Sequence, residues 1–275
     1  MIAGMWPHEI RLAGVTLDIW NAVFLLAVVV GYPLLLWTLR LRPRAAMPNW
    51  LPVRWLITVY AAAIGAQLFA YLFDLNTTLL PPPNVSALRY YLDPLAGPKT
   101  LYGAVLFLPV GILAVTVPWR DLGYVEGLDA WTPPMFAVLA VCRVGCFLQG
   151  CCYGVRSDHF GVAFPPNSLV YWEQLRAGLI QPGMATLPVV PTQLLSAGAL
   201  AVLAVWSAQQ LRRGRRNIFP LSIALYSLFR FAIEFLRADP DRNTLGVLST
   251  SQWIALLVVT VVGLGLSRLR PVAAA

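Results

Sequence analysis

One short stretch of the chain, residues 142–154, combines residue types that do chemistry in buried sites. It reads Cys-Arg-Val-Gly-Cys-Phe-Leu-Gln-Gly-Cys-Cys-Tyr-Gly and holds all four cysteines of the sequence. Its arginine, Arg143, interrupts an otherwise apolar run. An arginine at membrane depth costs roughly 2.5–3.5 kcal/mol on insertion scales and by default marks a functional site. We therefore expect Arg143 to bind an anionic group.

A second charged cluster follows the pattern R-x3-E-x2-R and consists of Arg230, Glu234 and Arg237. This spacing predicts that all three side chains share one helical face. Glu234 can neutralise only one arginine, so a positive charge remains, and in a membrane it must face the bundle interior. One interpretation is an ion-pair staple that only specifies packing. The other, joined with Arg143, is a phosphate site, because the planar arginine fork donates paired hydrogen bonds and stays charged when desolvated.

The cysteines do not match a known metal motif. Their C-x3-C-x4-C-C spacing is not a zinc or iron–sulfur signature, and no cluster of His, Asp or Glu has ligand spacing. A cysteine nucleophile usually needs a base, and the chain has only His8 and His159. We therefore expect no metal and no cofactor, and we interpret the cysteines as small packing residues. A disulfide through Cys151 or Cys152 is the alternative in an oxidising compartment.

Composition indicates which kind of fold must position these residues. Hydrophobic residues make up 59% of the chain and charged residues 12%, and the mean hydropathy is +0.69. Soluble domains carry about 25% charged residues. Long continuous apolar runs also exclude the alternating pattern of an outer-membrane barrel. Composition therefore predicts an all-α, polytopic membrane protein, with one transmembrane domain over residues 1–275 and loop elements outside the membrane at about 74–99 and 150–190.

Seven apolar runs are long enough to cross a membrane. We interpret Pro133 and Pro134 as the first turn of the fourth run, where proline is well tolerated. Short arginine-rich loops follow the first and fifth runs, so the positive-inside rule places the carboxyl terminus in the cytoplasm and the amino terminus on the outer side of the membrane. The net charge of +8 then reflects topology rather than nucleic-acid binding. The predicted spans are roughly 17–39, 53–73, 100–119, 131–149, 190–211, 217–237 and 251–269.

Polar residues begin three of these spans on the predicted outer side. They are Lys99–Tyr102, Pro191–Gln193 and Ser249–Gln252. Helix capping explains the serine and threonine residues. Gln193 and Gln252 are less expected in an apolar helix, and we predict that they form hydrogen bonds across helices.

Taken in order, these motifs resemble the prolipoprotein diacylglyceryl transferase family, and the resemblance covers about residues 100–255. The family acts in the bacterial inner membrane, spans it seven times and has its active site toward the periplasm, so the outer side that holds the amino terminus is the periplasmic one. The resemblance implies transfer of the diacylglyceryl group of phosphatidylglycerol to the lipobox cysteine thiol of a prolipoprotein, with release of glycerol phosphate. The matching motifs are Arg143-x-Gly145-Cys-Phe147-x-x-Gly150-x-x-x-Gly154, Pro191-Thr192-Gln193-Leu194, Arg230-x3-Glu234-Phe235-x-Arg237-x-x-Pro240-Asp241, and Gln252.

The resemblance also implies roles for single residues and partners. Arg143 and Arg230 are the implied catalytic or phosphate-binding arginines, with Tyr102 as a further catalytic candidate. The implied partners are phosphatidylglycerol, a prolipoprotein and membrane lipid. The residues expected to bind substrate are Arg237, Glu234, Gly145, Gly154, Gln193 and Gln149.

The chain departs from the family pattern at three places. Tyr102-Gly103-Ala104 stands where the family has His-Gly-Gly, and Gly145-Cys146-Phe147-Leu148-Gln149 where it has Gly-Asn-Phe-x-Asn. The family's His-Pro-[Ser/Thr]-Gln-Leu-Tyr-Glu reads Val190-Pro191-Thr192-Gln193-Leu194-Leu195-Ser196. Two histidines and a glutamate are thus replaced, and the Gly-Cys-Cys-Tyr-Gly sequence places the chain in a divergent branch.

The replaced histidines leave the proton of the acceptor thiol without an evident base. A thiol with a pKa of about 8.5 attacks well only as thiolate. Imidazole, with a pKa of about 6.5, suits this task better than a phenol of about 10. Either nearby arginines lower the pKa of Tyr102, or they stabilise the thiolate and the departing phosphate directly. A transferase with a different acceptor, and a non-catalytic phospholipid-binding or lipid-moving protein, remain as alternatives.

Overall fold

The computed structural model describes residues 9–12, 15–41, 50–73, 86, 92–93, 100–116, 123–238 and 244–268. The predicted loop element at 74–99 falls almost entirely outside these ranges, and so does the Pro240-Asp241 part of the last motif. The described chain is mainly helical, with two short antiparallel strand pairs beside the helices. The helices are α1 (Ile19–Arg40), α2 (Leu51–Phe73), α4 (Leu101–Thr116), α5 (Tyr124–Gln149), α6 (Leu169–Arg176), α7 (Thr192–Arg212), α8 (Ile218–Ile233), the 3-10 turn η1 (Glu234–Leu236) and α9 (Thr250–Arg268). The strands are β1 (Glu9–Leu12) with β2 (Val15–Asp18), and β3 (Thr244–Leu245) with β4 (Leu248–Ser249).

Six of the described segments are long and apolar enough to cross a membrane, which makes the chain a multi-pass membrane protein. They correspond to α1, α2, α5, α7, α8 with its 3-10 extension, and α9. The predicted third span is shorter, because α4 has 16 residues. At 1.5 Å per residue it is about 24 Å long, less than the ~30 Å of a bilayer's hydrocarbon core. Residues 117–122, the end of that predicted span and the residues after it, lie outside the described ranges.

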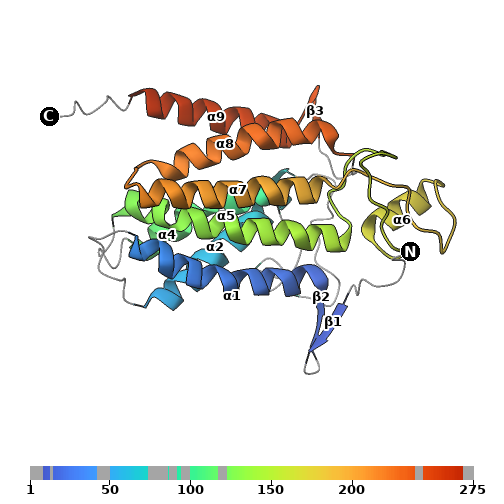
Figure 1. Cartoon of the computed structure of the whole chain (residues 1–275), viewed down its shortest axis with the longest axis horizontal. Helices are drawn as coiled ribbons and strands as arrows, with labels where there is room; N and C mark the ends of the chain where they lie inside the picture. The colour runs from blue at the N-terminus through green and yellow to red at the C-terminus, as the bar shows by residue number, and fades with distance from the viewer. Residues whose placement is uncertain are drawn as a thin grey trace.

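Helix α5 is the centre of the bundle. The long helices run side by side from α1 through α5, α7 and α8 to α9 (Figure 1). Helix α5 packs against both α1 and α7, while α2 pairs with α4 and α8 pairs with α9. Ala130 and Phe136 on α5 are completely buried. Arg143, in the last turns of α5, is therefore carried into the bundle, whereas Glu126 in the first turn stays partly exposed.

The start of α5 corrects the prediction for the fourth span. The helix begins at Tyr124 rather than near residue 131, so Pro133 and Pro134 lie inside it. Membrane helices tolerate internal proline when neighbouring groups satisfy the freed backbone atoms. The Thr132 hydroxyl donates to the Leu128 carbonyl at 2.7 Å, and buried Asp129 accepts from the backbone N–H of Phe219 at 3.0 Å. The Asp129 contact holds the first turns of α5 against α8, where sequence reasoning expected a loop.

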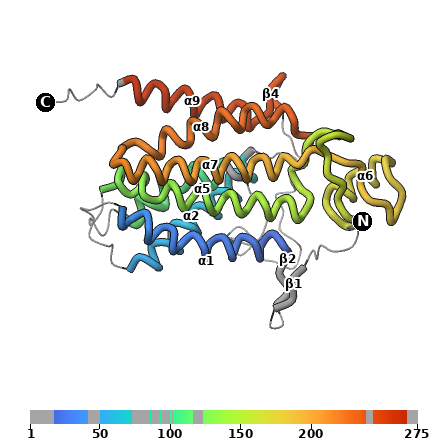
Figure 2. Tube along the Cα trace, viewed as in Figure 1, coloured from blue at the N-terminus to red at the C-terminus, as the bar shows by residue number. Residues whose placement is uncertain are grey.

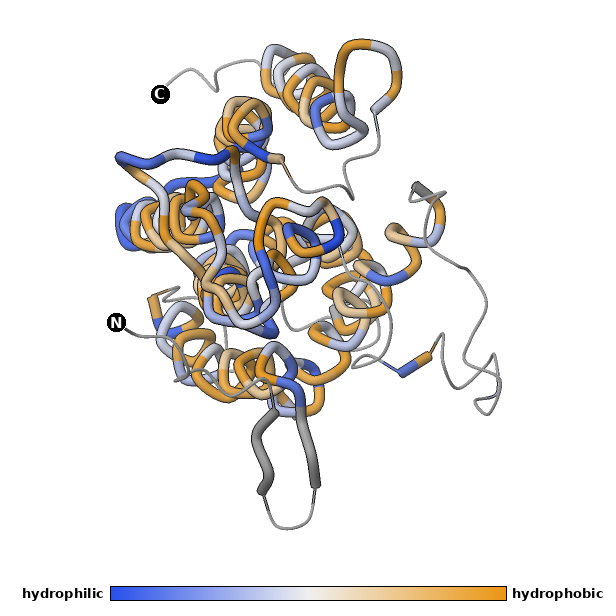
Figure 3. Tube along the Cα trace, turned by 90° about the vertical axis from the view of Figure 1, so that its right-hand side faces the viewer, coloured by the Kyte–Doolittle hydropathy of each residue, from blue (hydrophilic) through white to orange (hydrophobic). Residues whose placement is uncertain are grey.

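The segment between α5 and α7, residues 150–191, folds into a cap over one end of the bundle (Figure 2). The cap contains α6 and a small apolar core of Tyr153, Phe164, Val170 and Val189. Seen from this end, the helices are mostly hydrophobic and the longer hydrophilic stretches lie in the connecting segments (Figure 3). The cap therefore meets the ends of α5 and α8, where the predicted site residues are concentrated.

Gly103 sets the distance between α4 and α2, so we expect Gly103→Ala to destabilise the protein. A Cβ at this position would lie 2.4 Å from the Gly65 carbonyl oxygen and 2.6 Å from the Cα of Ala66, and both are backbone atoms. Overpacking of this kind costs about 1–3 kcal/mol, and each kcal/mol lowers the Tm of a chain of this size by about 2–4 °C. Thermal unfolding in detergent measures the change.

The matched control is Gly198→Ala in α7, where a Cβ would meet nothing within 4 Å. Its Tm should stay the same or rise slightly, because alanine restricts the unfolded chain. An equal loss of Tm in both variants would contradict the close packing at Gly103.

Candidate active site

The end of α8 brings two arginines onto one carboxylate. Arg230 donates through Nη1 to Glu234 Oε2 and through Nη2 to the Ser251 hydroxyl at 3.1 Å. Arg237 Nη1 lies 3.7 Å from the same Glu234 oxygen. Only 6% of Arg230 and 1% of Glu234 are exposed. The cluster is therefore a buried ion triad that keeps one net positive charge.

Arg237 reaches this triad from outside the helix, which corrects the prediction of one shared helical face. Helix α8 ends at Ile233, the 3-10 turn follows, and Arg237 has extended backbone angles. It pairs in an isolated antiparallel bridge with Gly154 of the cap. A Cβ on Gly154 would lie 2.7 Å from the Leu236 carbonyl oxygen and 2.8 Å from Thr192 Cγ2. Gly154 thus allows the close approach that positions Arg237.

Arg143 adds a third guanidinium near the same place. It lies in the last turns of α5, within electrostatic range of Arg230 and of Tyr226 on α8. Its Nε is buried and makes no hydrogen bond within the described part of the chain. Three arginines and one glutamate leave two positive charges at the cap end of an apolar bundle. An arrangement with this charge can hold an anion.

Two tyrosines line the neighbouring face of the cluster. The Tyr102 and Tyr226 rings form an edge-to-face pair with centroids 6.1 Å apart, and Tyr102 is within electrostatic range of Arg230. Among the described residues, the buried Tyr226 hydroxyl has no hydrogen-bond partner, whereas the Tyr102 hydroxyl interacts with Ser227. Sequence reasoning missed Tyr226. Its position four residues before Arg230, one turn away on the same helical face, is the signal that could have found it.

Gln193 and its neighbour connect α7 to the turn that follows α5. Gln193 Nε2 donates to the Cys151 carbonyl and the Thr192 hydroxyl donates to the Cys152 carbonyl, both at 2.6 Å. Gln252 on α9 donates to the Phe231 carbonyl of α8 at 3.4 Å. The predicted bond across helices is thus present for Gln252, whereas Gln193 bonds to the cap rather than to another helix. Its Oε1 is buried and lacks a partner within the described ranges.

Gly145 and Gln149 were predicted to bind substrate, but the structure gives them other surroundings. Gly145 faces α1, where a Cβ would be 3.3 Å from both Trp20 and Val23. Its small size serves the packing of α5 on α1. Gln149 is the last residue of α5 and is partly exposed. The structure therefore brings together Arg143, Arg230, Arg237, Glu234 and Tyr102, with Gly154 and Gln193 supporting them.

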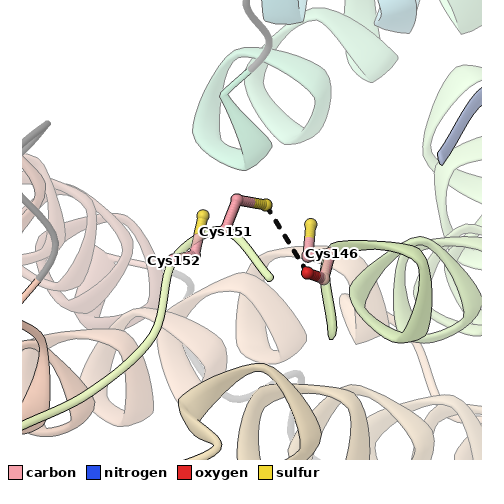
Figure 4. A group of neighbouring side chains, drawn as sticks. All are labelled: Cys146, Cys151 and Cys152. Carbon is pink, nitrogen blue, oxygen red and sulfur yellow. Dashed lines mark hydrogen bonds between the residues drawn. The ribbon is translucent and has the colours of Figure 1, made fainter. Parts of the chain in front are cut away.

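The cysteines form a cluster that sequence reasoning did not predict. The Sγ atoms of Cys146, Cys151 and Cys152 all lie within 4.8 Å of one another, and Figure 4 shows them gathered between α5 and the start of the cap. All four cysteines are free thiols. Gly150 ends α5 with φ 76° and Cys152 has φ 58°. These left-handed residues turn the chain back, so thiols five and six positions after Cys146 return to it.

The electrostatics of this cluster favour a thiolate at Cys152. Hydrogen bonds from the thiols of Cys146 and Cys151, together with the nearby cations Arg237 and Arg143, hold the pKa of Cys152 well below its ordinary value. The Cys151 thiol points toward the Cys146 carbonyl oxygen, 3.7 Å away. Its hydrogen bonds to the other two thiols and its burial raise the pKa of Cys151. The thiols and the arginines thus belong to one electrostatic unit.

Removing the carboxylate of Glu234 should leave buried Arg230 and half-buried Arg237 uncompensated, so we expect Glu234→Gln to destabilise the protein strongly. Breaking a buried ion pair costs about 3–5 kcal/mol. The control is Glu126→Gln, which breaks an exposed pair with Arg216 at 3.3 Å, and exposed pairs are worth about 0–1 kcal/mol. Thermal unfolding of both variants in detergent compares them. Similar stability losses would show that the triad is not the buried, coupled unit described above.

Comparison with known proteins places this chain in a family. The family model for prolipoprotein diacylglyceryl transferase matches residues 7–267. The chain is 27% identical over 210 residues to phosphatidylglycerol–prolipoprotein diacylglyceryl transferase 2 of Clostridium perfringens, which covers 74% of this chain and 73% of that protein. It is 24% identical to the Clostridium tetani transferase, over 75% of each chain, and 31% identical to a Dehalococcoides mccartyi transferase, over 62% of each. The chain therefore belongs to the prolipoprotein diacylglyceryl transferase family and is a transferase.

Proposed function

We propose that this protein transfers the diacylglyceryl group of phosphatidylglycerol to the lipobox cysteine thiol of a prolipoprotein and releases glycerol phosphate. The donor's phosphate sits between the guanidinium groups of Arg143 and Arg230. The names of the relatives support the reaction, because they specify both substrates. The observation that carries the proposal is the excess of buried positive charge at the cap end of the bundle.

The hydrogen-bonding state of the site supports a phosphate ligand. Buried polar groups in proteins are nearly always paired, so each exception calls for an explanation. Arg143 Nε and the hydroxyl of Tyr226 are buried and unpaired within the described part of the chain. Both groups are donors, and a phosphate offers several acceptor oxygens. Their location beside Arg230 is therefore what an anionic head group requires.

The reaction replaces a carbon–oxygen bond with a carbon–sulfur bond. The acceptor thiolate attacks the glyceryl carbon that carries the phosphate ester, and a new S–C bond forms. The C–O bond breaks, and its electron pair goes to the phosphate oxygen of the departing glycerol phosphate. Fixed cations lower the barrier, because they stabilise the charge that develops on this oxygen. Arg143 and Arg230 are the groups placed to do so.

The proposed function includes an orientation of the bundle in the membrane. Helix α4 provides the seventh span, and the cap end of the bundle faces the periplasm of a bacterial inner membrane. The arginine-rich turn at 212–216 joins α7 to α8 at the end opposite the cap, the same end at which α1 finishes with Arg40 (Figure 1). Basic residues on one side favour the cytoplasm for that side. Phosphatidylglycerol and the prolipoprotein then meet at the periplasmic surface of the bundle.

Arg143→Gln should reduce transfer by at least about 100-fold, because removal of a single donor that stabilises the transition-state anion costs about 10²–10³ in rate. Arg143→Lys keeps the charge but loses the paired donors, so we expect it to recover only part of the activity. The assay follows labelled phosphatidylglycerol and a lipobox peptide with the purified protein in detergent. Arg156→Gln is the control, because this cap arginine is exposed and forms a surface ion pair with exposed Asp158.

Full transfer by Arg143→Gln would rule out the proposed donor site. Binding of phosphatidylglycerol without transfer to any thiol peptide would favour the non-catalytic lipid-binding alternative. Transfer to a small-molecule acceptor in place of the peptide would favour a different acceptor.

Tyr226→Phe should leave stability nearly unchanged and lower transfer about tenfold. The buried hydroxyl has no partner among the described residues, so its removal breaks no internal hydrogen bond. A hydrogen bond to a charged ligand is worth about 1.5–3 kcal/mol, and 1.4 kcal/mol corresponds to about tenfold in rate. The control is Tyr124→Phe, whose hydroxyl donates to the Pro109 carbonyl at 3.1 Å. That variant should lose about 1 kcal/mol of stability and keep its activity, and the reverse pattern would contradict a ligand-binding role for Tyr226.

A further inference from the structure

We propose that Cys146, Cys151 and Cys152 bind a zinc ion whose fourth coordination position takes the thiol of the acceptor peptide. The inference rests on the proposed function, because it assigns the metal a role in that reaction. It also addresses the proton that the replaced histidines leave without a base. Within the described ranges the only histidine is His159. It is exposed in the cap, so it does not replace the family's buried histidines.

The geometry of the three thiols suits a tetrahedral zinc site. Zinc–sulfur bonds of about 2.3 Å in a tetrahedron separate the sulfur atoms by about 3.8 Å. The three Sγ atoms lie within 4.8 Å of one another. Side-chain rotations that shift the Sγ atoms by about 1 Å are therefore enough to bring them to zinc-binding distance. Cys142 is not part of this group, which leaves three protein ligands. Three protein ligands and one open position are the hallmark of a catalytic rather than a structural zinc site.

The backbone around the thiols is held in a conformation that serves this arrangement. Cys152 has φ 58°, a left-handed conformation that a residue with a side chain rarely adopts. The hydrogen bonds from Thr192 and Gln193 to the carbonyls of Cys152 and Cys151, both 2.6 Å, hold it there. Strained residues persist only where the surroundings enforce them, and they concentrate at functional sites. The two vicinal thiols therefore meet Cys146 through an enforced turn rather than by chance.

The charge of the surroundings favours thiolates. Three thiolates around one zinc ion carry one net negative charge, and a fourth thiolate raises it to two. Arg143 and Arg237 both lie within electrostatic range of Cys152, and the arginine cluster has two positive charges in excess. The two positive charges therefore balance the zinc centre with its three protein thiolates and the single negative charge of the donor's phosphodiester. This charge balance also explains why Arg237 is held at the cap by Gly154.

Zinc supplies what the missing base would have supplied. A thiol that coordinates a metal is deprotonated outright, and its proton passes to bulk water. The zinc-bound thiolate sulfur then attacks the glyceryl carbon, the S–C bond forms and the C–O electron pair leaves with the glycerol phosphate held by the arginines. The step needs no oxidant or reductant, and zinc has no redox chemistry of its own. Copper(I) is also selected by thiolates, but three thiolates already complete its trigonal coordination and leave no place for the acceptor.

Metal binding is tested on the full chain, purified in detergent, with zinc as the probe. We expect one zinc per protein, and we expect cobalt(II) in its place to show thiolate-to-metal charge-transfer absorption. Cys146→Ser and Cys152→Ser should weaken zinc binding by more than about 100-fold, because even changes outside the ligand shell cost about 10–100-fold. Cys142→Ser is the matched control, since it alters a buried cysteine of the same helix that lies outside the cluster, and it should keep its zinc.

The role of the open position is tested on the wild-type protein, so the result does not depend on how a variant folds. A lipobox peptide should change the cobalt spectrum toward four thiolate ligands, and the same peptide with serine in place of its cysteine should not. Removal of zinc with a chelator should abolish transfer to the peptide, and zinc, but not magnesium, should restore it. Phosphatidylglycerol binding should survive the chelator, because the arginines hold the phosphate.

The outcomes separate this inference from the proposed function. Transfer at the full rate by zinc-free protein would overturn the inference and leave the proposed function standing. Absence of zinc binding by folded protein, copper as the only bound metal, or equal zinc binding by Cys146→Ser and Cys142→Ser would also overturn it. Zinc binding without transfer from phosphatidylglycerol to any acceptor would contradict the proposed function, and with it the assignment of zinc to thiol activation.

Discussion

The structure depends on one electrostatic constraint, which is the burial of more positive than negative charge at one end of an apolar helix bundle. Glu234 contacts both Arg230 and Arg237 and neutralises one of them. Arg143 brings a further guanidinium within range of the same cluster. Isolated charges in a membrane are expensive and are retained where they serve a site. The bundle, the cap and the polar helix ends can all be understood as the scaffold that keeps this charge dry and in place.

Helix α5 and the cap share the work of assembling the site. Helix α5 runs through the centre of the bundle and carries Arg143 close to its end. Gly150 then terminates the helix, and the cap returns to α7 through bonds from Thr192 and Gln193. Gly154 completes the arrangement by letting the cap approach Arg237. Motifs that are separate in the sequence are therefore connected through the segment that follows Gly150.

The proposals divide the chemistry between two kinds of group. The arginines and the buried Tyr226 favour the phosphate that leaves, because they offer positive charge and unpaired donors. The thiols favour a soft metal ion, and through it the sulfur that attacks. Both lie in one electrostatic unit, since Arg143 and Arg237 interact with Cys152 as well as with the anion site. A nucleophile and a leaving group held on either side of the same carbon is what a displacement reaction requires.

By itself the sequence determined the membrane class, most of the spans and the identity of the charged cluster. Hydropathy and buried charge are local signals, so Arg143, Arg230, Glu234 and Gln252 could be singled out before any fold was known. The length of α5, the departure of Arg237 from the helix, the place of Gly145 against α1 and the partnership of Tyr226 with Tyr102 needed the tertiary structure. The cysteine cluster is the clearest case. Its spacing matches no metal motif because its geometry comes from left-handed turns at Gly150 and Cys152, held by hydrogen bonds from a helix some forty residues further along the chain.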